Sequence, residues 1–154
     1  MRPVSPYCRY MPDWSYNALT VSGDPDQVEE FSNFVAAEDD PEQLINFEKI
    51  KPTPAHLLEG DGWSLWRTWN WGTKWNAQCG STCIFVPGTA HYVFGTAWDP
   101  PVPIVALLDA KFPTLDFSLS WTAMGIGSKE HWKDGEHCNS VELSPEDTTV
   151  LEGL

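Results

Sequence analysis

The sequence predicts an α+β fold, a ferredoxin-like two-layer sandwich in which two helices cover one face of a four-stranded sheet. The first observation behind this prediction is the order of the apolar spacings, which indicates strand, helix, strand, strand, helix, strand along the chain. The second observation is the composition. Thirteen prolines and eleven glycines among 154 residues favour short elements and frequent turns over a helical bundle.

The first half of the chain supplies a strand, a helix and a second strand. Residues 15–22 alternate apolar and polar side chains, as a half-buried strand does. Asp24 and Pro25 are a typical N-cap and first helical residue, and an apolar stripe follows them, so we predict a helix over 25–37. Residues 44–50 alternate again before two prolines, which predicts the second strand.

A tryptophan-rich insertion precedes the second half of the pattern. It covers residues 55–88, between strands 2 and 3, and contains a short helix that we expect to end at Gly72. Residues 90–98 are predicted to be the third strand and residues 114–121 the fourth. Asp99, which stands before two prolines, is predicted to cap the helix between them. These elements complete the β-α-β-β-α-β order.

One ferredoxin-like domain over residues 11–125 accounts for these elements. We expect residues 1–10 to be an N-terminal extension and residues 126–154 to be an acidic C-terminal segment, with a short edge strand at 141–143. The sequence shows no apolar run of the ~20 residues that a membrane span needs. It also shows no secretory signal, so we expect a cytoplasmic protein with no membrane partner.

The charge balance narrows the class of partner. Nine basic residues against 22 acidic ones give a net charge of −13, which argues against direct binding of nucleic acid phosphates. Excess acidic residues can serve solubility alone, or they can form a face that docks on a basic protein. The acidic residues that we expect on such a face are Glu38, Asp39, Asp40, Glu42, Glu130, Asp134 and Glu136.

The cysteines allow a metal site as an alternative to ordinary free thiols. Cys79 and Cys83 stand in CGSTC, a spacing too wide for a CxxC redox pair but possible for zinc ligands. No second ligand pair follows at a comparable spacing, so we expect free thiols, no metal and no cofactor. The other residues that a metal site would draw on are His91, His131, His137 and Cys138.

The segment WNWGTKWNA at residues 69–77 is the strongest candidate for a ligand-binding site. Its three tryptophans around Lys74 can form an aromatic wall that stacks a nucleobase while the ammonium group meets a phosphate. The alternative is that these rings close the core over the sheet. Asp99 can similarly act as a ligand or base instead of a helix cap. The candidate binding residues are Trp69, Trp71, Lys74, Trp75, His91, Trp98 and Asp99.

Five segments occur in an order that resembles a known family. They are MPDWSYNALTVSG at 11–23, INFEKIKPTP at 45–54, WNWGTKWNA at 69–77, GTAWDPPVPIV at 95–105 and FSLSW at 117–121. Together they resemble the Api92-like or YubB-type proteins of phages, plasmids and integrated elements. The resemblance implies a ferredoxin-like domain and a mobile-element origin in a bacterial cytoplasm, and it implies no particular activity. After Trp121 the acidic continuation differs from the glycine-rich, aromatic one of that family.

The sequence contains no motif of a nucleophile elbow, phosphate loop, zinc protease or dinucleotide site. This absence favours a non-enzymatic interaction protein, and the resemblance described above implies that it belongs to a phage or mobile element. In this prediction it inhibits a host defence or nucleic-acid-binding protein that has a basic surface, through its acidic and aromatic residues. One alternative is a protein that sequesters a nucleotide-type ligand between tryptophans and Lys74. Another is an enzyme with a site near Lys74, His91 and Asp99.

Overall fold

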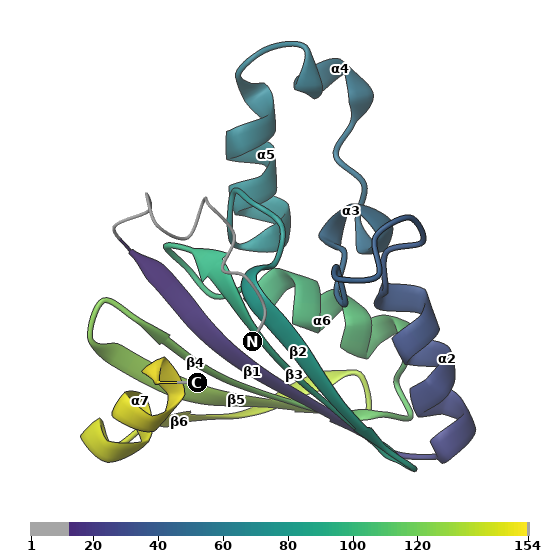
Figure 1. The fold of residues 1–154 in the computed structure, drawn as a ribbon, viewed down its shortest axis with the longest axis vertical. Coiled ribbons are helices and arrows are strands. Elements are labelled where there is room, and N and C mark those ends of the chain that lie inside the picture. The colour runs from purple at the N-terminus through teal and green to yellow at the C-terminus, as the bar shows by residue number, and fades with distance from the viewer. Residues whose placement is uncertain (1–12, 154) are drawn as a thin grey trace.

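Six antiparallel strands form one open sheet, and most of the helices pack on one of its faces (Figure 1). The computed structural model describes residues 13–153, with the backbone alone at 79–82. The expected extension at 1–10 lies outside the described residues. In chain order the strands are β1 (Trp14–Ser22), β2 (Gln78–Val86), β3 (Thr89–Ala97), β4 (Asp116–Ala123), β5 (Ile126–Lys133) and β6 (Glu136–Glu142). The helices are α2 (Pro25–Val35), α3 (Phe47–Ile50), α4 (Ala55–Leu58), α5 (Gly62–Trp71), α6 (Val102–Lys111) and α7 (Pro145–Glu152).

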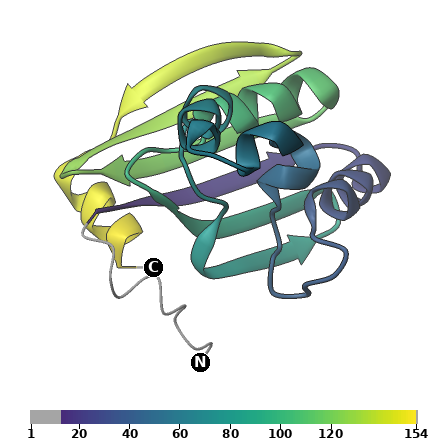
Figure 2. The ribbon, with the colours of Figure 1, turned by 90° about the horizontal axis from the view of Figure 1, so that it is seen from above.

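The predicted ferredoxin-like fold class is confirmed. The strand order is β2-β3-β1-β4-β5-β6, and every neighbouring pair runs antiparallel. Its first four strands, joined in the chain order β1-α2-β2-β3-α6-β4, have the ferredoxin-like arrangement. β5 and β6 extend the sheet as two further hairpins. Figure 2, seen from above, shows β6 at one edge of the sheet and β2 at the other.

The second strand is not where the alternation of apolar residues placed it. Residues 44–50 contain the one-turn helix α3 instead of a strand, so that prediction is wrong. Asn46 caps this helix, because its side-chain oxygen accepts a hydrogen bond from the Glu48 backbone N–H at 3.1 Å. Phe47 and Ile50 are both buried, and their spacing of three is helical. A short run of apolar residues therefore satisfied the strand pattern by coincidence.

The predicted insertion and C-terminal segment also take other forms. The insertion expected at 55–88 ends before β2, which is the true second strand, and it therefore lies between α2 and β2. The acidic residues 126–154 do not lie apart from the domain, because they form β5, β6 and α7. The edge strand expected at 141–143 overlaps the end of β6. Ser144 caps α7 by accepting from the Asp147 N–H at 3.1 Å.

The two predicted helix caps have opposite outcomes. Asp24 caps α2, because its carboxylate accepts from the Gln27 N–H at 3.2 Å, as predicted. Asp99 does not cap α6, whose N-cap is Pro101 without a side-chain hydrogen bond. A residue that precedes a proline is biased away from the helical conformation. The run of prolines after Asp99 therefore delays the helix to Val102.

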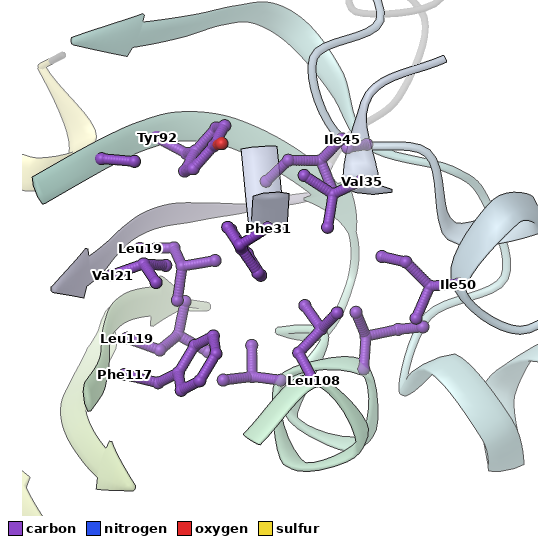
Figure 3. Packing of buried hydrophobic residues seen from close by; sticks show 14 of the residues in the cluster. Leu19, Val21, Phe31, Val35, Ile45, Ile50, Tyr92, Leu108, Phe117 and Leu119 are labelled. Carbon is purple, nitrogen blue, oxygen red and sulfur yellow. The ribbon is translucent and has the colours of Figure 1, made fainter. Parts of the chain in front are cut away.

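The core lies between the sheet and the helices α2 and α6, with Phe31 of α2 near its centre (Figure 3). Phe31 is fully buried and meets the rings of Tyr92, Phe112 and Phe117 edge-on, with ring centres 5.4–6.1 Å apart. These rings come from β3, from the end of α6 and from β4. The aromatic cluster therefore ties both long helices to the two strands that flank β1.

The described residues cover the opposite face of the sheet only in part. Gly127 of β5 pairs with Thr122 of β4, and a Cβ at Gly127 would lie 3.0 Å from the Thr148 hydroxyl of α7. Helix α7 therefore packs over this end of the second face. On the rest of this second face lie the strand residues that alternate with the core positions. We call this part of the sheet the open face. In the part of the chain that the structure describes, no helix could cross a membrane.

A buried carboxyl group lies where α6 meets the β5–β6 turn. Asp109 is buried, and its Oδ1 has no hydrogen-bond partner among the described residues. Burial raises the pKa of Asp109, and the nearby carboxylates of Asp116 and Asp134 raise it further. A backbone hydrogen bond from Gly135 opposes this shift only in part. Folding therefore favours the protonated form of this carboxyl more than the unfolded chain does.

We predict that Asp109→Asn stabilises the protein by about 1 kcal/mol at pH 7. Because folding raises the pKa of Asp109, ionisation costs stability as the pH rises from the unfolded value, near 3.8, through the folded one. The advantage of the neutral amide should therefore vanish below about pH 4. Urea unfolding at several pH values measures the difference in stability between the variant and the native chain. An equal effect of the substitution at every pH would contradict this account.

Candidate functional site

Arg67 holds the insertion on the domain. Its guanidinium carbon lies 4.9 Å from the ring centre of Trp63 and 4.7 Å from that of Trp71, so both indoles attract its charge. Nε donates to the Thr53 hydroxyl at 3.0 Å, and a terminal nitrogen pairs with the Glu48 carboxylate at 3.6 Å. These contacts join α5 to α3 and to the loop that follows α3.

Trp71 is the point at which α5 enters the core. It is fully buried, its indole N–H donates to the Lys51 carbonyl at 2.9 Å, and its ring meets Phe47 edge-on at 5.6 Å. The helix ends there, as predicted, because Gly72 adopts a left-handed conformation with φ of +85°. A Cβ at Gly72 would lie 2.7 Å from the Pro100 carbonyl oxygen, so the close approach also requires glycine.

Beyond Gly72 the chain packs beside the loop that precedes α6. The Thr73 hydroxyl donates to the Ala97 carbonyl at 2.8 Å. The Lys74 ammonium lies 5.1 Å from the ring centre of Trp75, a cation–π contact. The structure therefore gathers most of the predicted binding residues at the base of the insertion. These are Trp71, Lys74, Trp75, Trp98 and Asp99.

Two predicted residues lie elsewhere. His91 is on the open face of β3, where a ring nitrogen is 2.8 Å from the Thr20 hydroxyl. Trp69 is on the outer side of α5 and is strongly exposed. Because Trp71 lies in the core while Trp69 faces solvent, the tryptophans of residues 69–77 do not form one aromatic wall.

Three large apolar side chains of the insertion are exposed to solvent. Leu65 and Trp69, one helical turn apart on α5, are 65% and 77% exposed, and Leu58 of α4 is 51% exposed. Figure 1 shows α4 and the start of α5 standing away from the sheet. We call Leu58, Leu65 and Trp69 the insertion ridge. Exposed Glu59 and Asp61 lie in the turn between its two helices. Of the ridge residues, only Trp69 was predicted, because the local spacing does not show which apolar side chains stay exposed.

The predicted acidic face is divided. One group lies in the loop after α2, where Glu38 forms an exposed ion pair with Lys49 at 3.7 Å. A second group lies in the turn between β5 and β6, whereas Glu130 is largely buried. The exposed members are Glu38, Asp39, Asp40 and Glu42 in the first group and Asp134 and Glu136 in the second.

Glu130 is the largely buried centre of a polar network that reaches the surface at Ser140 and His137. Its carboxylate accepts from the hydroxyls of Ser128 and Ser140 at 2.9 and 3.0 Å and lies 2.8 Å from Nε2 of His137. Burial opposes ionisation of Glu130, but these hydrogen bonds outweigh it and hold the pKa of Glu130 below its ordinary value. The assignment of Glu130 to an acidic surface was therefore wrong, because its neighbours across β5 and β6 satisfy the carboxylate.

The predicted metal ligands do not converge within the described residues. In residues 13–153, apart from the side chains at 79–82, no three His, Cys, Asp or Glu side chains are placed to hold one ion. Cys83 and Cys138 carry free thiols. The side chain of Cys79 lies outside the described part of the structure, as does Cys8.

Comparisons with known proteins show what this chain is similar to. The family model described as "Ferredoxin-like domain in Api92-like protein" matches residues 70–152, more than half of the chain. A crystal structure of protein api92 from Yersinia pseudotuberculosis has a similar fold, with a TM-score of 0.70 and 12% sequence identity. The similarity covers 86% of this chain and 98% of that one. No curated protein matches the sequence. The family match includes the residues after Trp121, where a departure from the family was expected.

We predict that Arg67→Lys destabilises the protein by about 1–3 kcal/mol, because lysine keeps the charge but loses the planar fork between two indoles. Urea unfolding measures the change, and limited proteolysis should show faster cleavage within the insertion. Thr68→Ala is the control on the same helix, with an expected change within about 0.5 kcal/mol. Equal stability and protease resistance of the Arg67 variant and the native chain would contradict the role of Arg67.

We predict that Glu130→Gln costs about 1–3 kcal/mol of stability at pH 7. Because folding lowers the pKa of Glu130, its contribution is present above the unfolded value near 4.5 and is lost as the pH falls through the folded value. The difference from the native chain should therefore shrink in acid. Glu142→Gln, an exposed change on β6, is the control. A pH-independent loss in the Glu130 variant would show that the carboxylate charge is not responsible.

Proposed function

This chain belongs to the Api92-like family of ferredoxin-like domains, and on that premise we propose that it is a non-enzymatic binding module that docks on a protein partner through the insertion ridge. The observation that carries the proposal is the exposure of Trp69. A tryptophan that is 77% exposed, one turn from an exposed leucine, is costly to leave in water and is the residue type that most often anchors an interface.

The fixed orientation of the helix supports this proposal. Arg67 and Trp71 hold α5 against the domain on its inner side, so Leu65 and Trp69 are presented on a helix whose position is already determined. A preorganised contact surface loses little conformational entropy on binding. The ridge therefore has the properties of an interface anchor.

The partner that the surface favours has an apolar pocket with basic groups around it. Glu59 and Asp61 flank the ridge, and the chain as a whole carries a net charge of −13. Such a charge speeds association with basic surfaces and repels acidic ones. We propose a host protein that binds nucleic acid as this partner, with occupation of its basic surface as the means of inhibition.

The two alternatives have less support. A nucleotide stacked between Trp69, Trp71 and Lys74 would need an open aromatic wall, but Trp71 is in the core. An enzyme site would need Lys74 and Asp99 to meet His91. His91 lies instead on the open face, where it contacts Thr20.

We predict that Trp69→Ala weakens partner binding at least tenfold, as loss of a central tryptophan anchor does. The chain and its variant are each immobilised, incubated with bacterial lysate at low and high salt, and compared for the proteins that they retain. A partner identified in this way is then purified and titrated. Its binding should weaken at high salt because of its basic rim.

Met124→Ala is the matched control, since Met124 is apolar, equally exposed at 77% and located in the turn between β4 and β5. Unfolding measurements confirm that both variants are folded. A purified partner that binds both variants with native affinity would refute the ridge as the docking surface. A partner lost from the Trp69 variant alone would support it.

A further inference from the structure

The open face is a grid of cross-strand rows. The registers place Thr20 opposite both His91 and Ser118, Ser118 opposite His131, and His131 opposite Asn139. At β4, β5 and β6 this face is hollowed into a concavity of about 470 Å³. The residues that line it are Ser118, Lys129, His131, Asn139 and Val141.

The hydrogen-bond donors in this concavity are unused. The side chains of Ser118, Lys129, His131 and Asn139 make no hydrogen bond or ion pair with any described residue. An ammonium group can only donate, and the hydroxyl, imidazole and amide can each donate as well. Four donors from three neighbouring strands therefore converge on one concavity without an acceptor among the described residues.

The positive charge here is also uncommitted. Every second residue of this part of β5 points to the open face, and these residues are Lys129, His131 and Lys133. Neither lysine contacts an acidic side chain or a ring within the described chain. Glu136 is paired in register with Lys133, so acidic charge lies at that end of the row and not at Lys129. The other described cations are engaged: Lys49 with Glu38, Arg67 with Glu48, and Lys51, Lys74 and Lys111 over aromatic rings.

We propose that this concavity binds the phosphate group of a small phosphorylated molecule. A lysine beside hydroxyl, imidazole and amide donors matches the charge and the acceptor oxygens of a phosphate monoester. The volume falls within the range of small-molecule sites, and Val141 supplies an apolar wall for the rest of the ligand. This site is independent of the insertion ridge, because it uses the opposite face of the sheet and different residues.

A small ligand fits the charges better than a nucleic acid strand does. The chain carries a net charge of −13, and the unengaged cations that the described residues place on this face belong to one strand. A polyanion would extend past them to Asp116 and Glu136, where like charges repel it. A single phosphate is small enough to stay within the concavity, beside Lys129 and away from these carboxylates.

The test is an NMR titration of the full chain with inorganic phosphate, with AMP and with a short single-stranded oligonucleotide at constant ionic strength. We expect saturable shifts of the backbone amides of Ser118, Lys129, His131, Asn139 and Val141 with phosphate and AMP. Lys129→Gln should weaken AMP binding about tenfold, because a charge-assisted hydrogen bond is lost. Lys111→Gln removes the same charge from the helical side and should leave the affinity unchanged.

Three outcomes would overturn the proposal. They are the absence of saturable shifts at these amides, equal binding by the Lys129 variant, and binding of the oligonucleotide without AMP. The same variant separates this site from the proposed partner docking, because Lys129→Gln leaves Leu65 and Trp69 unchanged. Partner capture by the Lys129 variant should therefore equal that of the native chain.

Discussion

The cation of Arg67 between the indoles of Trp63 and Trp71 is the contact on which the insertion depends. A helix of ten residues is too short to be stable alone in water, so α5 must draw its stability from tertiary packing. Only part of that packing is hydrophobic, because the outer side of the helix remains exposed. The guanidinium adds two cation–π contacts, and the cost of its partial burial is offset by Thr53, by Glu48 and by a hydrogen bond to the Lys74 carbonyl at 3.4 Å. The position of the insertion ridge is therefore a consequence of this stack.

The sheet separates the two proposed surfaces. An antiparallel sheet can bury one face and expose the other, and here the aromatic cluster around Phe31 occupies the buried face together with α2 and α6. Among the described residues, only α7 packs on the second face, at one end, and no described helix covers the polar rows between β3 and β6. The ridge and the open-face concavity consequently stand on one rigid scaffold but share no residue. A protein partner and a small ligand can therefore be tested as separate functions.

Sequence reasoning succeeded where local rules decide the conformation. The spacing and cap of α2 depend on neighbours within one turn, and the end of α5 depends on the left-handed Gly72. It failed at residues 44–50 because a strand and a one-turn helix can share the same few apolar positions, and only the Asn46 cap distinguished them. It also failed at Asp99, where the effect of consecutive prolines outweighed the preference for an acidic cap. In α7, Ser144 at the N-cap and Pro145 at the first helical position are a local signal that predicts the start of this helix.

The fold class was determined by the sequence itself, since hydrophobic periodicity and capping act over a few residues and define the elements that a sheet and its helices can combine. Tertiary structure alone decided the roles of individual side chains. It placed Trp71 in the core and Trp69 in solvent, although both belong to the same helix. It surrounded Glu130 with donors from β5 and β6, and it brought Ser118, Lys129 and Asn139 together from three strands. These outcomes depend on strand register and on neighbours distant along the chain, which local spacing does not encode.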